Sequence, residues 1–369
     1  MLVKLNIPEG SPSQIDMKPK KAAADSFYLD VARKVLSETL RLKKGETLTV
    51  ETWSNSLPFA LIVAHEAKKM GAIPLVVYED EDAYLEGVRS TPKDVLGVMG
   101  KHELGLLSGS DAYVFIPGPP LASYNKKITR QEYVDSTKYN DSWYKAAEKA
   151  GLRGARLTFG YLGEDIAEVL GKPLDEMTRH HLQAALADFD KMGKKGNEIA
   201  KHLVDGSMAT IKGKGTDLSF ELKGELEIQD GITDAEDISA GNNVAYVPAG
   251  FVYKEVDTAT VTGKARLSPT LTRFGLLKDA TLVFEKGKIV DWRSVKSSKV
   301  LRDLGEAIPE KSRVLYAITI GLNPAMKFGY GQDRFPAGSI GLVSTFTGIL
   351  QGATLKVGAE TIVKAGKLL

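Results

Sequence analysis

The chain of 369 residues contains no cysteine and only five histidines, all in its first 202 residues: His65, His102, His180, His181 and His202. Disulfides and thiolate catalysis are therefore excluded. From residue 203 onward the chain has neither a thiolate nor an imidazole ligand. A metal site in this C-terminal part would have to use carboxylates and other oxygen ligands, which suit magnesium or calcium better than zinc.

Long apolar runs and an excess of charge are also missing. No stretch approaches the ~18 apolar residues of a membrane span, and the first residues lack the apolar core and cleavage site of a secretory signal. Lys and Arg number 49 and Asp and Glu 47, so the net charge favours neither nucleic acid nor an anionic membrane as partner. We expect a cytoplasmic protein, and the lack of cysteine favours a thermophilic source.

The length exceeds the ~250–300 residues at which single cores stop growing, so two domains are expected. Residues 1–25, with the basic cluster Lys18–Lys21, are expected to form a polar N-terminal arm. Residues 26–205 alternate helical patterns with the strand patterns Thr47–Trp53, Ile73–Tyr78 and Ala112–Ile116. Strands of this continuous apolar kind are typical of a buried parallel sheet, which predicts an α/β domain. The segment 51–56 after the first strand lacks glycine and is no nucleotide-binding loop.

Residues 174–206 have a helical pattern that carries His180 and His181. Adjacent helical residues point ~100° apart, so these two cannot bind one metal, and we interpret them as surface or half-buried structural residues. From residue 206 the pattern changes to short alternating strands with frequent turns, which predicts a β-rich α+β domain over 206–369. The predicted strands of this domain are Met208–Lys212, Leu218–Leu222, Glu225–Ile228, Val244–Val247, Ala259–Val261, Thr281–Glu285 and Lys288–Trp292.

Four segments of the second domain carry a family resemblance. They are Lys214-Gly-Thr-Asp-Leu-Ser-Phe220, Asn243-Val-Ala-Tyr-Val-Pro-Ala-Gly-Phe-Val-Tyr253, Ile318-Thr-Ile-Gly-Leu-Asn-Pro324 and Asp333-Arg-Phe-Pro-Ala-Gly-Ser-Ile-Gly-Leu-Val343. Their order and spacing resemble the aminopeptidase T-like (thermophilic and staphylococcal aminopeptidase) metallopeptidases. The resemblance extends from about residue 28 to the end and implies the fold of that family.

The resemblance also implies a centre with two divalent metals about 3.5–4 Å apart. At four positions where it implies a metal ligand, the chain has Phe251, Ala317, Arg334 and Gly341. The His-x-Asp pair that closes the family's site has no counterpart, since Thr345–Gly352 leads directly into a terminal hairpin. We therefore expect a degenerate site with no metal and no other cofactor.

Three functions remain open at this point. The first is a non-catalytic homologue that acts as a binding or assembly protein for a peptide or protein. The second is an enzyme that uses the same cleft with oxygen-only ligands or without metal. The third is an aminopeptidase whose ligands lie elsewhere. The resemblance further implies a homodimer formed by the second domains, with the first domains shielding the cleft.

The second function would depend on polar residues that remain in the cleft, namely Tyr253, Glu255, Asp257, Tyr330 and Asp333, together with Arg334. Each also has an ordinary structural interpretation. Glu255 and Asp257 alternate with Lys254 as on an exposed strand edge, and Asp333 with Arg334 would form an ion pair in a turn. The two tyrosines would be half-buried packing residues.

Overall fold

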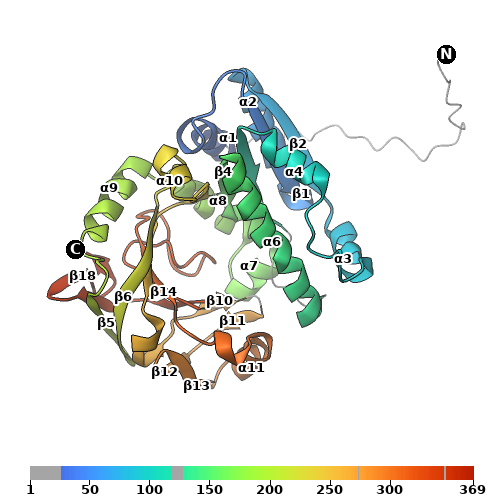
Figure 1. Cartoon of the computed structure of the whole chain (residues 1–369). Coiled ribbons are helices and arrows are strands. Elements are labelled where there is room, and N and C mark those ends of the chain that lie inside the picture. The colour runs from blue at the N-terminus through green and yellow to red at the C-terminus, as the bar shows by residue number, and fades with distance from the viewer. Residues whose placement is uncertain (1–25, 119–127, 273, 345) are drawn as a thin grey trace, which may run out of the picture.

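The computed structural model describes residues 26–118, 128–272, 274–344 and 346–369, so the predicted arm lies outside the described residues. Two sheets organise the described chain (Figure 1): a parallel sheet with helices in the N-terminal part and a larger antiparallel sheet in the C-terminal part. This is the predicted fold class. Among the described residues, none of the helices has both the length and the apolar character needed to span a membrane.

The first sheet has five parallel strands in the order β2-β1-β3-β4-β7. Helices α1, α2 and α8 pack against one face, and α4 and α6 against the other. The strands are β1 (Thr47–Trp53), β2 (Ile73–Glu79), β3 (Ala112–Phe115), β4 (Arg153–Leu157) and β7 (Val244–Val247). The helices of this part are α1 (Ser26–Lys34), α2 (Leu57–Lys69), α3 (Glu81–Ser90), α4 (Lys101–Ser108), α6 (Arg130–Ala150), α7 (Glu164–Leu170) and α8 (Leu174–Ala185). The next helix, α9 (Phe189–Ala200), packs against the antiparallel sheet instead.

Local signals in the sequence explain where these helices begin and end. Thr129 and Glu132 form a capping box at the start of α6, and Gly151 ends the helix in the left-handed conformation. Pro58 lies in the first turn of α2, where its missing N–H costs nothing. The helical pattern predicted as one segment over 174–206 forms two helices. The helical conformation is interrupted after α8, and Asp188 then caps the start of α9.

Two strands differ from their predicted positions. Strand β2 was predicted to be buried, but it forms the edge of the sheet, where Ile73 is 62% and Leu75 51% exposed. Strand β7 was counted with the second domain, but it pairs in parallel with β4 of the first sheet. The chain therefore enters the second domain, returns to the first sheet and then re-enters the second domain.

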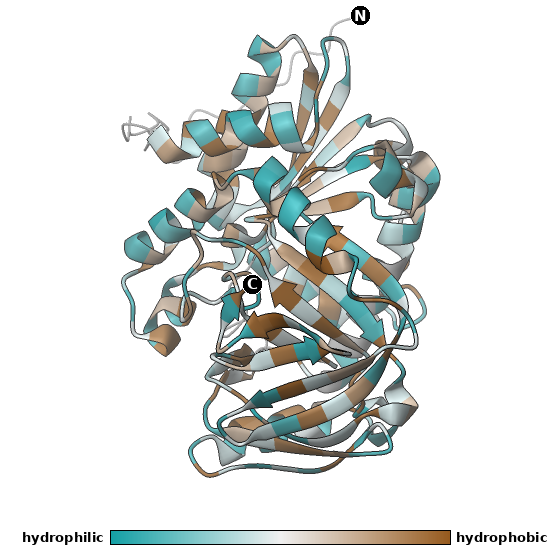
Figure 2. Cartoon of the chain, turned by 90° about the vertical axis from the view of Figure 1, so that its left-hand side faces the viewer, coloured by the Kyte–Doolittle hydropathy of each residue, from teal (hydrophilic) through white to brown (hydrophobic). Residues whose placement is uncertain are grey.

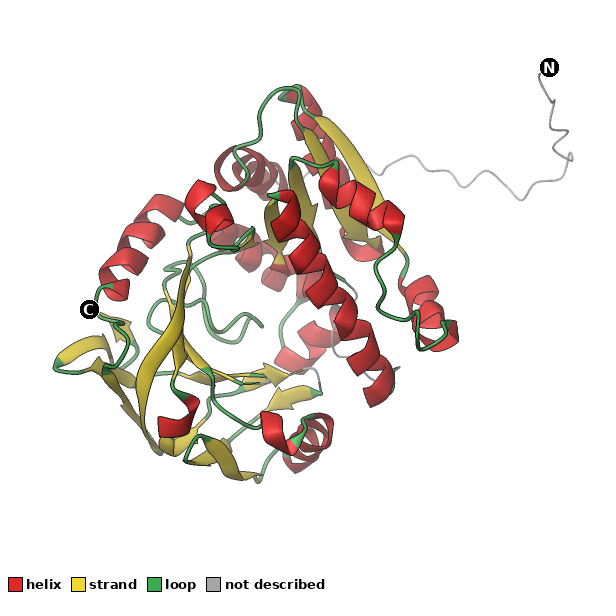
Figure 3. Ribbon diagram, in the orientation of Figure 1, coloured by secondary structure: helices red, strands yellow, loops and turns green. Residues whose placement is uncertain are grey.

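The second sheet has 12 antiparallel strands, with the main path β16-β15-β14-β8-β6-β5-β17-β18-β19 and β9, β12 and β13 branching from β6. Its strands are β5 (Met208–Gly213), β6 (Thr216–Gln229), β8 (Phe251–Val256), β9 (Thr262–Arg266), β12 (Ala280–Glu285), β13 (Lys288–Ser294), β14 (Ala317–Gly321), β15 (Ile340–Val343), β16 (Thr347–Leu350), β17 (Thr354–Val357), β18 (Glu360–Lys364) and β19 (Lys367–Leu368). A two-stranded sheet of β10 (Thr270–Thr272) and β11 (Gly275–Leu277), and the helices α10 (Ala235–Ser239) and α11 (Ser298–Ala307), complete this part (Figure 3).

Of the strands predicted in the second domain, those at β5, β12 and β13 are present, whereas strands β8, β10, β11, β14, β15 and β16 were not predicted. Two further predictions differ from the structure. The two strands predicted over 218–228 are one 14-residue strand, β6, with an irregular register between Leu222 and Leu226. The predicted strand Ala259–Val261 is wrong: residues Thr258–Thr260 form a 3-10 turn, which Asp257 caps. The predicted hairpin between β12 and β13 is present, with Glu285 opposite Lys288.

The central strands of this sheet alternate between two environments (Figure 2). Val252, Ile318 and Leu342 point into the main apolar core of the second domain. Lys254 points the same way and is only 3% exposed, with its ammonium group bonded to Asp205 and to the carbonyl of Gly224. The interpretation of Lys254 as part of an exposed strand edge is therefore wrong, because β8 lies inside the sheet.

Candidate functional site

The face of strands β8, β14 and β15 opposite to the core collects most of the predicted positions. In the strand register Tyr253 lies opposite Thr319, and Thr319 lies opposite Gly341. Two residues further along β8, Glu255 lies opposite Ala317 of β14. Because alternate residues of a strand share a face, these positions and Phe251 lie on one side of the sheet. We call this side the cleft face.

Phe251 and Arg334 form a packed stack at one end of the cleft face. Phe251 is 4% exposed and packs with Phe335, Met326 and Ala184. The guanidinium carbon of Arg334 lies 4.9 Å from the ring centre of Phe251 and 5.0 Å from that of Phe335. It also lies 5.0 Å from the ring of Tyr246, which comes from the first sheet. Two positions of the implied metal site are thus in direct contact through a cation–π arrangement.

Gly341 and Ala317 lie further along the same face, in a tightly packed region. A Cβ atom at residue 341 would lie 2.2 Å from Oγ1 of Thr319 and 3.0 Å from Cγ2 of Thr347. Ala317 is fully buried. Oγ1 of Thr319 is itself buried and has no hydrogen-bond partner among the described residues. Space at residue 341 is therefore occupied by a neighbouring threonine.

The remaining polar candidates are held by local contacts. Oε2 of Glu255 accepts a hydrogen bond from the N–H of Glu225 at 3.0 Å. Asp257 lies at the end of β8, where it pairs with Lys223 at 3.1 Å, so it is separate from the other candidates.

Tyr330 and Asp333 lie in the segment between β14 and β15. The Tyr330 hydroxyl donates to Glu176 of α8 at 2.6 Å. Oδ1 of Asp333 accepts from the N–H of Gly329 at 2.7 Å, and burial raises the pKa of this carboxyl to about 6. The predicted ion pair between Asp333 and Arg334 does not form in the described structure.

His180 and His181 are more deeply buried than predicted, at 7% and 0% exposure. Nε2 of His180 accepts a hydrogen bond from the N–H of Lys327 at 3.0 Å, and its ring lies 3.9 Å from that of Tyr330. Nδ1 of His181 bonds to the carbonyl of Met177 at 2.9 Å, and burial lowers the pKa of His181 to about 4. Burial also lowers the pKa of His180. His180 joins α8 to the second domain, and His181 bonds within α8.

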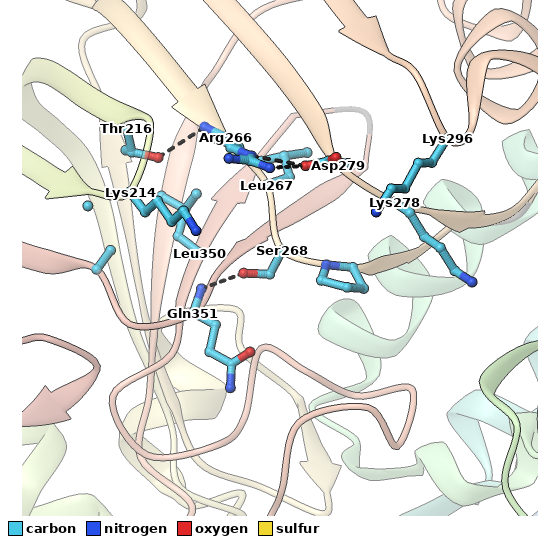
Figure 4. A pocket seen from close by; sticks show the side chains of 13 residues that line it. Lys214, Thr216, Arg266, Leu267, Ser268, Lys278, Asp279, Lys296, Leu350 and Gln351 are labelled. Carbon is cyan, nitrogen blue, oxygen red and sulfur yellow. Dashed lines mark hydrogen bonds and ion pairs between the residues drawn. The ribbon is translucent and has the colours of Figure 1, made fainter.

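Two pockets lie in the second domain. One, of about 300 Å³, is lined by residues 331–334, by Thr270–Thr272 and by Thr347 and Ile349 of β16. Ile349 lies opposite Gly341 in the register, so this pocket adjoins the cleft face. The other, of about 390 Å³, is rich in basic residues (Figure 4): Lys214, Arg266, Lys278 and Lys296, with Arg266 paired to Asp279. None of the predicted site residues lines the basic pocket.

The sequence reading missed a group of acidic residues beside the first sheet. Glu51 of β1 accepts a hydrogen bond from the Tyr113 hydroxyl. Glu103 of α4 accepts one from the Tyr139 hydroxyl at 2.7 Å. Burial, Glu51 and Glu103 together raise the pKa of Glu79, at the end of β2, to about 7. The sequence could have indicated this group, because Glu51 and Glu79 lie near the carboxyl ends of two neighbouring parallel strands.

The substitution Glu79→Gln is expected to stabilise the fold in alkaline solution. The pKa of Glu79 in the folded state, about 7, lies above the ordinary value of 4.5. Below pH ~4.5 the carboxyl is neutral in both the folded and the unfolded state, so its burial does not lower the stability. As the pH rises through 7 the buried carboxyl must become charged, and the fold is destabilised. Removing the charge should raise the free energy of unfolding by about 1–3 kcal/mol at pH 8 and have little effect at pH 5. Urea unfolding at both pH values tests this, with Glu86→Gln on the exposed side of α3 as the control. An equal effect at both pH values would contradict the explanation.

The family comparison can now be set beside this geometry. The sequence model of the family described as thermophilic metalloprotease (M29) matches residues 28–307. The chain belongs to the M29 family. The predicted resemblance is thereby confirmed. Ala317, Arg334 and Gly341 lie beyond the last matched residue of the M29 model.

A solved structure extends the comparison to the rest of the fold. Wild-type AmpT from Thermus thermophilus is 16% identical, with a TM-score of 0.66 over 93% of this chain and 99% of that chain. At this identity the likeness shows a common fold. Among curated proteins, none matches the chain. The M29 architecture therefore continues past the residues that the family model recognises.

The M29 family implies a divalent metal, and the residues at the implied positions do not fit one. Phe251 and Ala317 have hydrocarbon side chains, Arg334 is a cation, and the space at Gly341 is taken by Thr319. Metal centres of this kind need several carboxylate and imidazole groups that converge. Among the described residues, no three His, Cys, Asp or Glu side chains come together in a way that could hold a metal ion.

Proposed function

We propose that the chain is a non-hydrolytic member of the M29 family that acts as a binding or assembly protein. The observation that carries this proposal is the stack of Arg334 on Phe251, Phe335 and Tyr246. A guanidinium at this place would repel a divalent cation about 5 Å away by roughly 7 kcal/mol at an effective dielectric constant of ~20. The rings hold the guanidinium in position, so it cannot move aside without losing its packing.

A second candidate function is an enzyme that uses oxygen ligands on the cleft face. It is favoured by the position of Tyr253 between two carboxylates, since Glu227 of β6 lies opposite Tyr253 and Glu255 lies two residues along β8. Burial raises the pKa of Glu227, while its hydrogen bond with Gln229 lowers it. Against this candidate, both carboxylates already have partners, in Gln229 and in the N–H of Glu225.

Metal content and turnover separate these functions. Protein purified without chelator is expected to carry no stoichiometric metal and to hydrolyse neither leucine nor phenylalanine p-nitroanilide when zinc, cobalt or manganese is added. Stoichiometric metal together with turnover would overturn the proposal. Turnover that is lost in Glu255→Gln and Glu227→Gln, but kept in the exposed control Glu285→Gln, would establish the oxygen-ligand enzyme instead.

We also propose that the second domains pair in a homodimer, as the family resemblance implies. Val290 of β13, 53% exposed, and Val295 just after it, 94% exposed, are apolar residues that such an interface would cover. Light scattering of the same preparation is expected to give twice the 40.0 kDa of one chain. A mass of one chain would count against the dimer without affecting the proposal on the cleft.

A further inference from the structure

The guanidinium of Arg334 has no acceptor among the residues that the structure describes. Its side chain makes no hydrogen bond or ion pair with any described residue, although a guanidinium carries five N–H donors. Arg156, whose guanidinium carbon lies 5.9 Å from the centre of the same Tyr246 ring, differs in this respect. Arg156 donates to the hydroxyls of Tyr144 and Tyr161, and only its buried Nε lacks a partner among the described residues. Within the described residues, Arg334 is thus the one of these two arginines for whose side chain no hydrogen bond is seen.

Within the described residues, neither neighbouring carboxyl group forms an ion pair or a hydrogen bond with Arg334. Asp333 is directed to the N–H of Gly329. Glu227 lies near enough for Arg334 to lower its pKa, but it accepts its hydrogen bond from Gln229. A half-buried guanidinium whose N–H groups lack acceptors gains from binding one. The rings of Tyr246, Phe251 and Phe335 lie about 5 Å from its central carbon, and a guanidinium packed on rings can still offer its N–H groups to a planar anion.

The 300 Å³ pocket that Arg334 lines gives the rest of the ligand its character. Leu271, Leu304 and Ile349 contribute an apolar wall. The hydroxyls of Thr270 and Thr272 already donate to the carbonyls of Ser268 and Gly275 at 2.9 and 2.8 Å. The pocket is therefore apolar along one side. Its charged lining residues are Arg334 and Asp333, and the Asp333 carboxyl is turned to the N–H of Gly329. The volume is at the lower end of the range for small-molecule sites.

We propose that Arg334 and this pocket bind a small monocarboxylate with an apolar chain. The carboxylate would take the edge of the guanidinium with two parallel hydrogen bonds, and the chain would lie against the apolar wall. A strongly hydrated phosphate would gain nothing from that wall. This inference rests on the proposed function, because it needs the place of the metal centre to be free of metal.

Isothermal titration of the full chain with 4-methylpentanoate tests the inference. The expected result is saturable binding that is at least about tenfold weaker for 4-methylpentan-1-ol, for 4-methylpentylamine and for inorganic phosphate. Equal or tighter binding of any of these three would overturn it, and so would the absence of binding of 4-methylpentanoate at millimolar concentration.

Two variants locate the site. Arg334→Gln is expected to abolish binding, and Arg334→Lys, which keeps the charge and the packing stem, should weaken it about tenfold because it loses the two-point contact. Arg293→Gln, on the exposed side of β13, is the control and should bind as the wild type does. Wild-type affinity in Arg334→Lys, with its fold checked by circular dichroism, would overturn the assignment.

The two proposals fail in different ways. Stoichiometric metal with turnover overturns the proposed function. Metal-free, inactive protein that does not bind the carboxylate overturns only the ligand inference.

Discussion

Replacing Asn323 by Ala is expected to lower the free energy of unfolding by about 3–5 kcal/mol, because it leaves several buried polar groups without partners. Asn323 is fully buried. Its side-chain amide donates to the carbonyls of Ala184 and Ala249 at 3.0 and 2.8 Å. Its oxygen accepts from the N–H groups of Ala325 and Met326 at 2.9 and 3.2 Å. A single side chain thus satisfies four backbone groups.

The position of these groups explains why the loss should be cooperative. Ala184 is near the end of α8 in the first domain, whereas Ala249 lies just before β8 in the second. Asn323 therefore ties α8 of the first domain to the chain just before β8 of the second. Asn323→Asp should cost more than the alanine variant, since a carboxylate would face two carbonyl oxygens in place of the amide donor.

Urea unfolding followed by tryptophan fluorescence measures the effect. The control is Asn242→Ala, a half-buried asparagine outside this network, for which a change within about 0.5 kcal/mol is expected. If Asn323→Ala unfolded within about 1 kcal/mol of the control, the hydrogen bonds seen here would not be what holds the two domains together.

Asn323 also illustrates what the sequence could reveal. The segment Gly321-Leu-Asn-Pro324 marked the family resemblance, but its role in joining the domains depends on a carbonyl 139 residues earlier in the chain. Local features were predicted well, because apolar alternation, caps and turn residues act over a few positions. The bounds predicted for β1, Thr47–Trp53, are those in the structure.

Long-range neighbours could not be predicted in the same way. The apolar run of β2 has the composition of a central strand, yet nothing in it specifies that only one neighbour pairs with it. Likewise, Val244–Val247 has the same alternation in either sheet, and its pairing with β4 is decided by the whole domain arrangement. Lys254 appeared exposed from its own strand, but its partner Asp205 comes from a separate turn.

In the candidate site, too, the sequence indicated individual positions but not their neighbours from distant parts of the chain. The family resemblance pointed to the positions Phe251, Ala317, Arg334 and Gly341, and their equivalence to metal ligands stays a prediction. The resemblance could not reveal that Arg334 meets Tyr246, because that ring is contributed by the first sheet. The open donors of Arg334, which carry the ligand inference, likewise become visible only when all neighbouring acceptors have been assigned.

The substitution Gly341→Ala is expected to cost about 2–3 kcal/mol of folding free energy, the usual range for inserting a methyl group into a packed core. Its Cβ would lie 2.2 Å from Oγ1 of Thr319, well inside van der Waals contact. Thr319→Ala removes that oxygen, which is buried without a partner among the described residues, so this variant alone should be close to neutral. The double variant should then recover most of the loss.

A double-mutant cycle measured by urea unfolding tests this coupling, with an expected interaction energy of about 2 kcal/mol between the two sites. Gly87→Ala on α3 is the matched control, because no atom lies within 4 Å of its added Cβ, and a helix gains up to about 1 kcal/mol from this change. Additive effects at residues 341 and 319 would show that the site relaxes freely. If the coupling is present, a side chain at residue 341 requires Thr319 to become smaller or to move, so the packing of the sheet itself opposes any larger residue there.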